Sequence, residues 1–469
     1  MKVREPYIYE ALLSFGLLIL VMGIGIAVFK ADPHIPMLIG AAFAALMALK
    51  IGYKWDFIEK SMFDGISQAL QAIVILAIIG VLIGVWLLSG VVPTMIYYGL
   101  QILSPKIFLV ATLVICSIIS LATGTSWGTI GTIGIALMGV ANGLGIPAPI
   151  AAGAIISGAY FGDKMSPLSD TTNLAPAMAG TDVFTHIKFM MKPTIVAYAI
   201  AMITFAVVGM KFAGANVDMT SIEAMKTGLK ESFNLSPFLF IPPIVVILSI
   251  ARKMPAIPGI FLGIILGAIM APIFQGSNFG DILTASYSGF VSNTGSASLD
   301  SLLSAGGLTN MMYSISLAIL SMMFGGIMEK TGQLEVIVNK LLKVVKTAQG
   351  LIILTIATCI GSNMAMPEQY ISIVIPGRMY AKAYRDMNLH PKTLSNALES
   401  SGTLTSALIP WNTCGVFIYG VLGVPTYMYA KWAVFNYTMP IVVILLSFVG
   451  VTVAYMTKEE KLIQESKAM

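Results

Sequence analysis

Uninterrupted apolar runs are the feature that most limits how this chain can fold. The run "ALLSFGLLILVMGIGIAVF", residues 11–29, approaches the roughly 20 residues that a helix needs to cross a bilayer. One such run at the N-terminus would fit a signal peptide, but similar runs recur to the end of the chain. The composition agrees, because 10% of the residues are charged and the mean hydropathy is +0.87, whereas soluble domains carry about 25% charged residues.

We therefore predict an all-α polytopic membrane protein. Two apolar stretches, 107–141 and 349–377, are interrupted by "TGTSWG" and "MPEQY". Each is predicted to form either two crossings or one re-entrant hairpin, whose tip must be surrounded by protein or by a watery cavity. The other predicted spans lie near residues 10–30, 35–50, 68–89, 150–165, 193–212, 237–251, 257–275, 308–328, 393–420 and 432–456.

The positive charges predict the orientation of these spans. With a cytoplasmic N-terminus, most lysines and arginines fall in cytoplasmic segments, as the positive-inside rule requires. Residues 276–307 contain no lysine or arginine, which is typical of an external loop. We expect a multi-pass protein of a bacterial-type plasma membrane with both termini in the cytoplasm.

The chain also repeats itself. A shift of about 242 residues places Gly84 on Gly326, and a shift of 243 places Pro167 on Pro410. The "IP" at 35–36 matches the one at 257–258 with a shift of 222, so about 20 residues were inserted in the second half. Each half contains about five crossings plus one interrupted segment. Since an odd number inverts the second half, we predict two inverted-topology repeats with broken helices at the midplane, an arrangement typical of secondary transporters.

These counts divide the chain into four predicted parts. They are repeat 1 in the membrane (1–212), an external linker (213–236), the inverted repeat 2 (237–456) and a cytoplasmic tail (457–469).

Polar residues gather where the chain otherwise avoids them. "YFGDKMSPLSDTTN" covers 160–173, and "ESSGTLTSALIPWNT" covers 399–413. Each contains a proline that interrupts a helix, and the carbonyl, hydroxyl and carboxylate oxygens nearby are suitable ligands for Na⁺. The predicted ion- or substrate-binding residues are Thr123, Thr125, Ser126, Asp163, Asp170, Thr171, Thr172, Asn173, Glu368, Gln369, Glu399, Ser401, Thr403, Asn412 and Thr413, with Na⁺ at Asp170, Asn173 and Ser126.

The acidic residues allow two interpretations. A carboxylate deep in a membrane is costly and usually functional, which favours ion coupling by Asp163, Asp170, Glu368 and Glu399. The alternative is a structural role, in which Asp163 pairs with Lys164 or with another buried base, and Glu399 caps a helix or pairs with Arg378 or Lys392 near the cytoplasmic face. We read Lys164 as a counter-charge rather than a ligand.

The two interrupted tips are predicted to share one cavity. The shift of 243 places Thr125 on Glu368, so one tip offers hydroxyls where the other offers a carboxylate. We expect Thr123, Thr125, Ser126 and residues 170–173 to form mainly a cation site. Its counterpart would comprise Glu368, Ser401 and Asn412.

Other chemistries find little support. Cys116, Cys359 and Cys414 fit no disulfide or metal spacing, and the chain contains no H-E-x-x-H motif. We therefore expect neither an enzyme nor a cofactor. The net charge of +5 gives no reason to expect a nucleic-acid partner.

Four motifs, "GTSWGT", "GAYFGDKMSPLSDTTNLA", "LDSLLSAGGL" and "ESSGTLTSALIPWNTCG", resemble those of the NhaC-type Na⁺/H⁺ antiporters of the ion transporter superfamily. The resemblance implies secondary active exchange of Na⁺ and H⁺ by a homodimeric, elevator-like protein in the lipid bilayer. The family also resembles members that exchange malate with protons for lactate with Na⁺, and members described as amino-acid carriers. Organic-acid or amino-acid exchange coupled to Na⁺ and H⁺ is therefore the alternative.

Overall fold

A computed structural model describes residues 3–29, 31–213, 219–342 and 345–457. Within these ranges every regular element is a helix, and the extended pairings are two isolated bridges. Eight helices are long and apolar enough to cross a membrane, or nine if the bent pair α12 (Met219–Ser232) and α13 (Ile241–Ala251) forms one span. The prediction of an all-α polytopic membrane protein is thus confirmed. The eight are α1 (Ile8–Ala27), α2 (His34–Ile51), α4 (Leu70–Leu88), α6 (Pro105–Thr123), α11 (Val183–Ala213), α14 (Ala256–Gln275), α17 (Leu308–Lys330) and α19 (Ala348–Ala365).

Some predicted boundaries differ from the structure. A separate helix, α3 (Trp55–Gln68), precedes α4, and the two are divided at Ala69. The predicted linker contains α12, while 214–218 and most of the predicted tail, 458–469, lie outside the described residues. The predicted span 393–420 is not continuous. It divides into α21 (Pro391–Leu398), a π-helical turn (Glu399–Thr403), α22 (Leu404–Ser406) and α23 (Thr413–Leu422).

Both interrupted stretches contain the expected breaks. The helix α6 ends at Gly124, whose φ of 71° is a left-handed conformation that favours glycine. The chain resumes with α7 (Ser126–Thr129), a π-helical turn (Ile130–Gly134) and α8 (Ile135–Gly143). In the second half α19 ends just before Pro367, and α20 (Ile371–Asp386) follows.

The polar motifs form a second pair of breaks. The helix α9 (Ala148–Met165) ends before Pro167, and α10 (Asp170–Ala179) begins after the cap residue Ser169. In the second half the cap residue Asn412 precedes α23. Both α10 and α23 end at a glycine with positive φ.

Several helix boundaries recur at a constant spacing. Helices α6 and α19 begin 243 residues apart, as do α9 and α21, and α10 and α23. The spacing between α5 (Val91–Ile102) and α18 (Gln333–Leu342) is 242 residues. Between α14 and α17 lie two helices, α15 (Phe279–Ser288) and α16 (Ala297–Leu303), where the first half has only α3 between α2 and α4. The extra helix agrees with the expected insertion.

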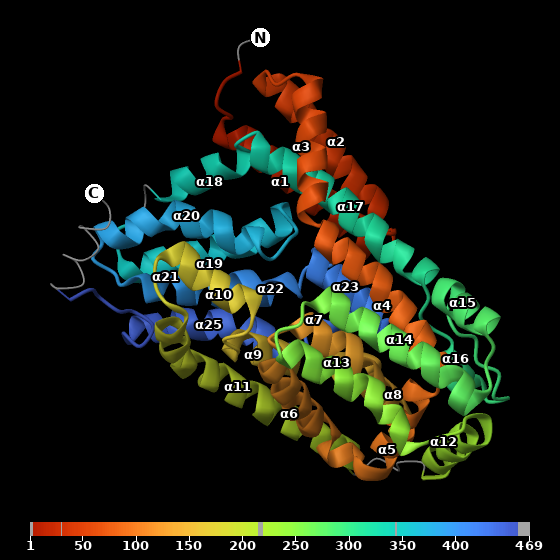
Figure 1. Ribbon diagram of the computed structural model, residues 1–469. Coiled ribbons are helices and arrows are strands. Elements are labelled where there is room, and N and C mark those ends of the chain that lie inside the picture. The colour runs from red at the N-terminus through yellow and green to blue at the C-terminus, as the bar shows by residue number, and fades with distance from the viewer. Residues whose placement is uncertain (1–2, 30, 214–218, 343–344, 458–469) are drawn as a thin grey trace.

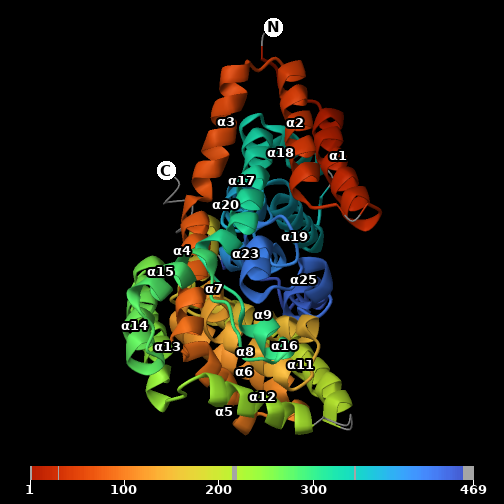
Figure 2. The same ribbon diagram turned by 90° about the vertical axis from the view of Figure 1, so that its right-hand side faces the viewer.

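The helices pack as two groups (Figure 1). The frame group comprises α1–α4, α13–α15 and α17, in which α17 packs on α2 and α3, and α14 packs on α4. The core group comprises α6–α11 and α19–α25, in which α6 packs on α9 and α11 packs on α25 (Val434–Phe448). Figure 2 shows α1, α2 and α3 at one end of the molecule, away from α6 and α11.

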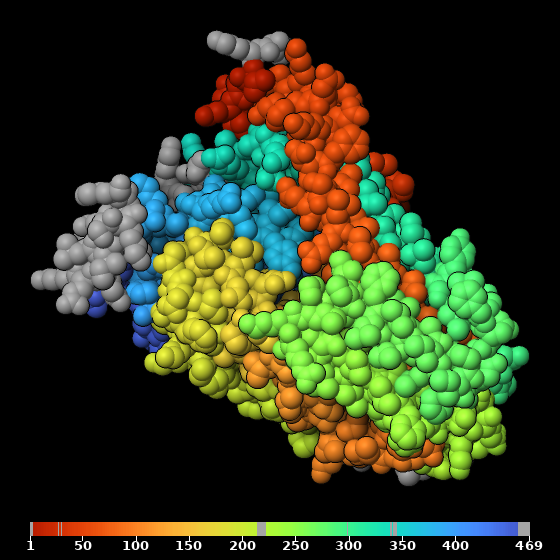
Figure 3. Space-filling view, in the orientation of Figure 1, coloured from red at the N-terminus to blue at the C-terminus, as the bar shows by residue number. Residues whose placement is uncertain are grey.

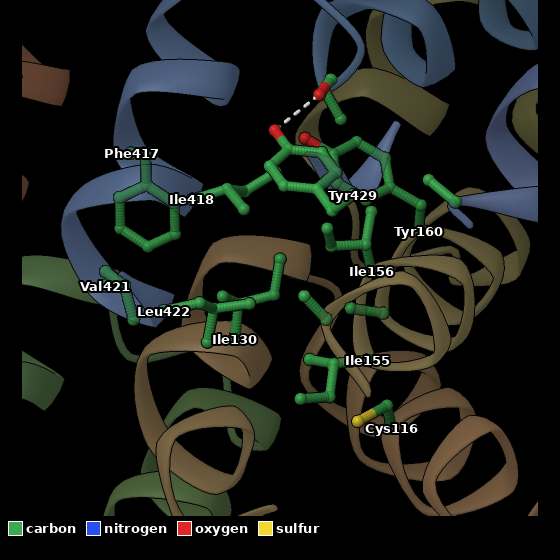
Figure 4. Packing of buried hydrophobic residues seen from close by; sticks show 14 of the residues in the cluster. Cys116, Ile130, Ile155, Ile156, Tyr160, Phe417, Ile418, Val421, Leu422 and Tyr429 are labelled. Carbon is green, nitrogen blue, oxygen red and sulfur yellow. Dashed lines mark hydrogen bonds between the residues drawn. The ribbon is translucent and has the colours of Figure 1, made fainter. Parts of the chain in front are cut away.

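Buried apolar side chains join the two halves of the chain inside the core group. Ile155, Ile156 and Tyr160 of α9 lie in one cluster with Phe417 and Leu422 of α23 (Figure 4). This core holds the broken helices together, because residues from both halves contribute to it.

The predicted topology can be tested at residues 276–307. The test uses a variant that lacks the three native cysteines, all of which are buried. In this variant the exposed residue Asn293 is replaced by cysteine, and the new thiol should react with an impermeant thiol reagent added to intact cells. The exposed Asp386 replaced by cysteine should react only after lysis. Labelling of the Asn293→Cys variant only after lysis would contradict the orientation.

Candidate functional site

A cavity of about 130 Å³ lies between the frame and core groups. The frame side is formed by α4 with α13 and α14, and the core side by both interrupted tips and the start of α10. Figure 3 shows the surface of α10, in yellow, facing that of α13 and α14, in green. The polar lining residues are Gln68, Gln71, Thr125, Ser126, Trp127, Thr132, Asp163, Ser169, Asp170, Thr171, Glu368, Gln369 and Tyr370.

The cavity is acidic. Its lining includes Asp163, Asp170 and Glu368, and no lysine, arginine or histidine is among the described residues that line it. Asp163 and Glu368 are each 5% exposed, whereas Asp170 is exposed. Because Asp163 and Glu368 are buried, negative charge here is weakly screened and favours a cation.

Asp163 connects the end of α9 to the first tip. Its Oδ2 accepts hydrogen bonds from the backbone N–H of Ser126 at 3.1 Å and from the Ser126 hydroxyl at 2.7 Å. The Thr125 hydroxyl accepts a hydrogen bond from the N–H of Gly128 at 3.2 Å. The carboxylate and the cap together satisfy N–H groups that the break at Gly124 leaves free.

Glu368 has a similar position at the second tip. Its Oε2 accepts hydrogen bonds from the N–H groups of Tyr370 at 2.6 Å and Ile371 at 3.2 Å. The neighbouring Gln369 accepts a hydrogen bond from the Cys414 thiol at 3.2 Å, which ties the tip to the start of α23.

The start of α10 forms the third part of the lining. Ser169 caps the helix by accepting a hydrogen bond from the N–H of Thr172 at 3.4 Å. The hydroxyls of Ser169 and Thr171 lie 3.2 Å apart. Asp170 is the first residue of α10, where the helix dipole stabilises a carboxylate.

A buried polar cluster lies next to this lining. Lys164 Nζ donates a hydrogen bond to Ser400 at 3.0 Å, and the Thr171 hydroxyl donates one to Glu399 Oε1 at 3.2 Å. Lys164, Glu399 and Ser400 have no exposed surface. None of the three lines the cavity.

The structure therefore places the predicted residues in two sets. Thr125, Ser126, Asp163, Asp170, Thr171, Glu368 and Gln369 line the cavity, while Thr123, Thr172, Asn173, Glu399, Ser401, Thr403, Asn412 and Thr413 do not.

Most residues of the second set hydrogen-bond to nearby backbone. Ser401 donates to the carbonyl of Ala397 at 2.6 Å, and the Asn173 amide donates to the carbonyl of Ser169 at 2.7 Å. The Asn412 amide donates to Asn363 of α19 at 3.1 Å.

Sequence reasoning missed six polar lining residues. Gln68 and Gln71 lie three positions apart, on either side of the division between α3 and α4 at Ala69, a spacing that in a continuous helix would place both on one face and that could have identified them. Trp127 stacks on Phe417 with ring centroids 4.1 Å apart, a contact that no local pattern predicts. The others are Thr132, Ser169 and Tyr370.

The donor set suits a monovalent cation held by oxygen atoms. Among the described residues no group of three or more histidine, cysteine, aspartate or glutamate side chains could hold a metal ion.

A polytopic helical protein with an acidic, partly buried cavity between two helix groups has the architecture of an ion transporter. The family model described as "Na+/H+ antiporter family" matches residues 158–451, and the chain belongs to this family. The family resemblance seen in the sequence is confirmed.

Curated relatives match along nearly the whole chain. The malate-2H⁺/Na⁺-lactate antiporter of Bacillus subtilis is 38% identical, with 97% of each chain covered. The Na⁺/H⁺ antiporter NhaC of Alkalihalophilus pseudofirmus is 38% identical, covering 96% of this chain and 97% of the relative. The arginine/ornithine antiporter ArcD of Halobacterium salinarum is 35% identical, covering 99% and 96%.

Gly162 allows a test of how Asp163 is positioned. A Cβ atom at Gly162 would lie 2.4 Å from the Ser117 carbonyl oxygen and 2.6 Å from the Leu121 nitrogen, so Gly162→Ala should push α9 away from α6. We expect a loss of about 1–3 kcal/mol, measured as a lower melting temperature of the purified protein. The control Gly361→Ala has no atom within 4 Å of the added carbon and should be neutral or slightly stabilising. Equal melting temperatures would contradict the close packing.

Proposed function

We propose that the protein is a secondary active transporter that exchanges Na⁺ for H⁺. The observation that carries this proposal is the acidic cavity, which both interrupted tips line and which has no basic side chain among its described lining residues. Because Na⁺ and H⁺ both bind carboxylate oxygens, the two ions compete for the same groups. Such competition couples the outward movement of one ion to the inward movement of the other.

The same cavity disfavours an organic anion as the main substrate. A dicarboxylate such as malate would need a cationic partner, and the nearest buried cation, Lys164, donates its hydrogen bond to Ser400 and does not line the cavity. The exchange named for the Bacillus subtilis relative is therefore less compatible with this cavity than the Na⁺/H⁺ exchange named for the NhaC relative.

Asp163, Ser126 and Asp170 form the proposed cation site. The Asp163 carboxylate and the Ser126 hydroxyl lie 2.7 Å apart, so one ion can contact both oxygens. Asn173 remains a predicted contributor through backbone movement, since its amide donates to two carbonyls. Glu368 is the proposed proton-binding counterpart at the second tip.

We further infer inverted repeats and elevator-like movement. The recurring helix boundaries support the duplication. Helices of each half also pack against helices of the other half, because α4 packs on α14 and α17 packs on α2. The cavity lies between the frame and core groups, so movement of the core against the frame would carry bound ions across the membrane. A homodimer joined through the frame group, in a bacterial-type plasma membrane, completes the proposal.

Everted vesicles test the exchange directly. Adding Na⁺ to acidified vesicles should raise the internal pH only where the protein is present, and malate, lactate or arginine should not be required. Asp163→Asn should reduce the exchange at least about tenfold, because a buried membrane carboxylate is rarely dispensable. The exposed Asp386 provides the matched control, and Asp386→Asn should exchange normally.

Ser126→Ala should weaken Na⁺ binding rather than abolish exchange. A hydrogen bond to a charged group contributes about 1.5–3 kcal/mol, so the Na⁺ concentration for half-maximal rate should rise about tenfold. An unchanged Na⁺ dependence in this variant, together with normal exchange by Asp163→Asn, would exclude the proposed cation site.

A further inference from the structure

Two buried charges join the broken helices of the two halves. Lys164 is the second-last residue of α9, and Glu399 begins the π-helical turn that follows α21. Both side chains have no exposed surface, and Lys164 donates a hydrogen bond to Ser400, the residue that follows Glu399. The charged and titratable groups near them are Asp163, which is bonded to Ser126, and His186, whose Nδ1 lies 2.8 Å from the Ser395 hydroxyl.

The contacts around this pair close into a ring. Lys164 Nζ donates to Ser400 at 3.0 Å, and the next residue back, Glu399, accepts from Thr171 at 3.2 Å. Thr172, which follows Thr171, donates its hydroxyl hydrogen to the Lys164 carbonyl at 3.0 Å. The ring therefore connects the end of α9, the start of α10 and the π-helical turn of the second half.

The ring borders the cavity without forming its ion-binding surface. Asp163 directly precedes Lys164, and Asp170 directly precedes Thr171, so both proposed cation ligands are attached to ring members. Neither Lys164 nor Glu399 lines the cavity. A change in the ring would move Asp163 and Asp170 even though no ion touches the charged pair.

The geometry points to Lys164 and Glu399 as positioning residues, a buried clamp that holds the two broken segments in register so that Asp163 and Asp170 face the same ion. This inference rests on the proposed function. In this arrangement Glu399 carries no ion. Lys164 does not act as a ligand, and its role is to hold the two broken segments in register. A buried pair tolerates the loss of both charges far better than the loss of one, because a single buried charge is left without its partner.

Variants that remove one or both of the buried charges distinguish a positioning clamp from an ion-carrying site. Exchange of ²²Na⁺ for Na⁺ in proteoliposomes should be measured against Na⁺ concentration and pH for Lys164→Met, Glu399→Gln and the double variant. Each single variant should lower the maximal rate at least about tenfold. The double variant should recover most of the rate, with the half-saturating Na⁺ concentration and the pH profile of the original protein.

A second pair of variants covers the case in which the single variants do not accumulate. Ser400→Ala removes the acceptor of Lys164 together with the hydrogen bond that the Ser400 hydroxyl donates to Asn396 at 3.2 Å, and it should lower the maximal rate without changing the pH profile. The matched control Ser321→Ala loses a buried hydroxyl that donates only within its own helix, to Leu317 at 2.8 Å, and should exchange normally. Recovery of membrane levels in the double variant would also support the clamp.

Three results would overturn the clamp. They are a double variant that accumulates but stays as slow as the single variants, a double variant that has lost its pH dependence, and a normal rate for Ser400→Ala. Absence of Na⁺ exchange by the unaltered protein would instead refute the proposed function, so the two failures can be told apart.

Discussion

Four of the described helices, α7, α10, α20 and α23, begin inside the bundle, and the N–H groups at their starts determine much of the site. A bilayer offers no water to satisfy them, so side chains must do so. Asp163 accepts from the N–H of Ser126 at the start of α7, and Glu368 accepts from that of Tyr370 before α20. Ser169 and Asn412 cap α10 and α23 in the same way. The breaks can exist in a membrane because each one has a buried acceptor.

This requirement explains why two of the proposed ion-binding residues, Asp163 and Glu368, are also structural acceptors. A carboxylate that caps a helix start keeps at least one further lone pair for a cation. In the proposed function, the attraction of an ion bound to Asp163 or Glu368 would compete with the hydrogen bonds that hold the tip. This competition would link the energy of ion binding to the conformation of the tips, and through them to the contact between the frame and core groups.

The two halves share a scaffold but differ in chemistry. The same interhelical contact occurs twice, because the Ser120 hydroxyl donates to the Ala159 carbonyl at 2.6 Å and the Asn363 amide donates to the Gly402 carbonyl at 2.7 Å. Both donors and both acceptors are 243 residues apart. At the exposed helix start, however, the first half has Asp170 where the second has buried Thr413. The start of α10 is therefore acidic and open to the cavity, whereas the start of α23 is neutral and enclosed.

Local residues alone determined the membrane class, the places of the breaks and the spacing of the two halves. Recurring apolar runs of sufficient length predict membrane helices, and Gly124, Pro167 and Pro410 interrupt the helical pattern at the breaks, whereas Pro193 lies inside α11. The tertiary structure decided which polar groups meet. Lys164 reaches Ser400 across 236 positions of sequence, and Glu399 points to Thr171 rather than into the cavity, while Gln68 of the frame group lines it. These outcomes depend on how each helix is rotated and docked against distant helices, and hydrophobic periodicity does not fix that rotation in helices that are apolar on every side.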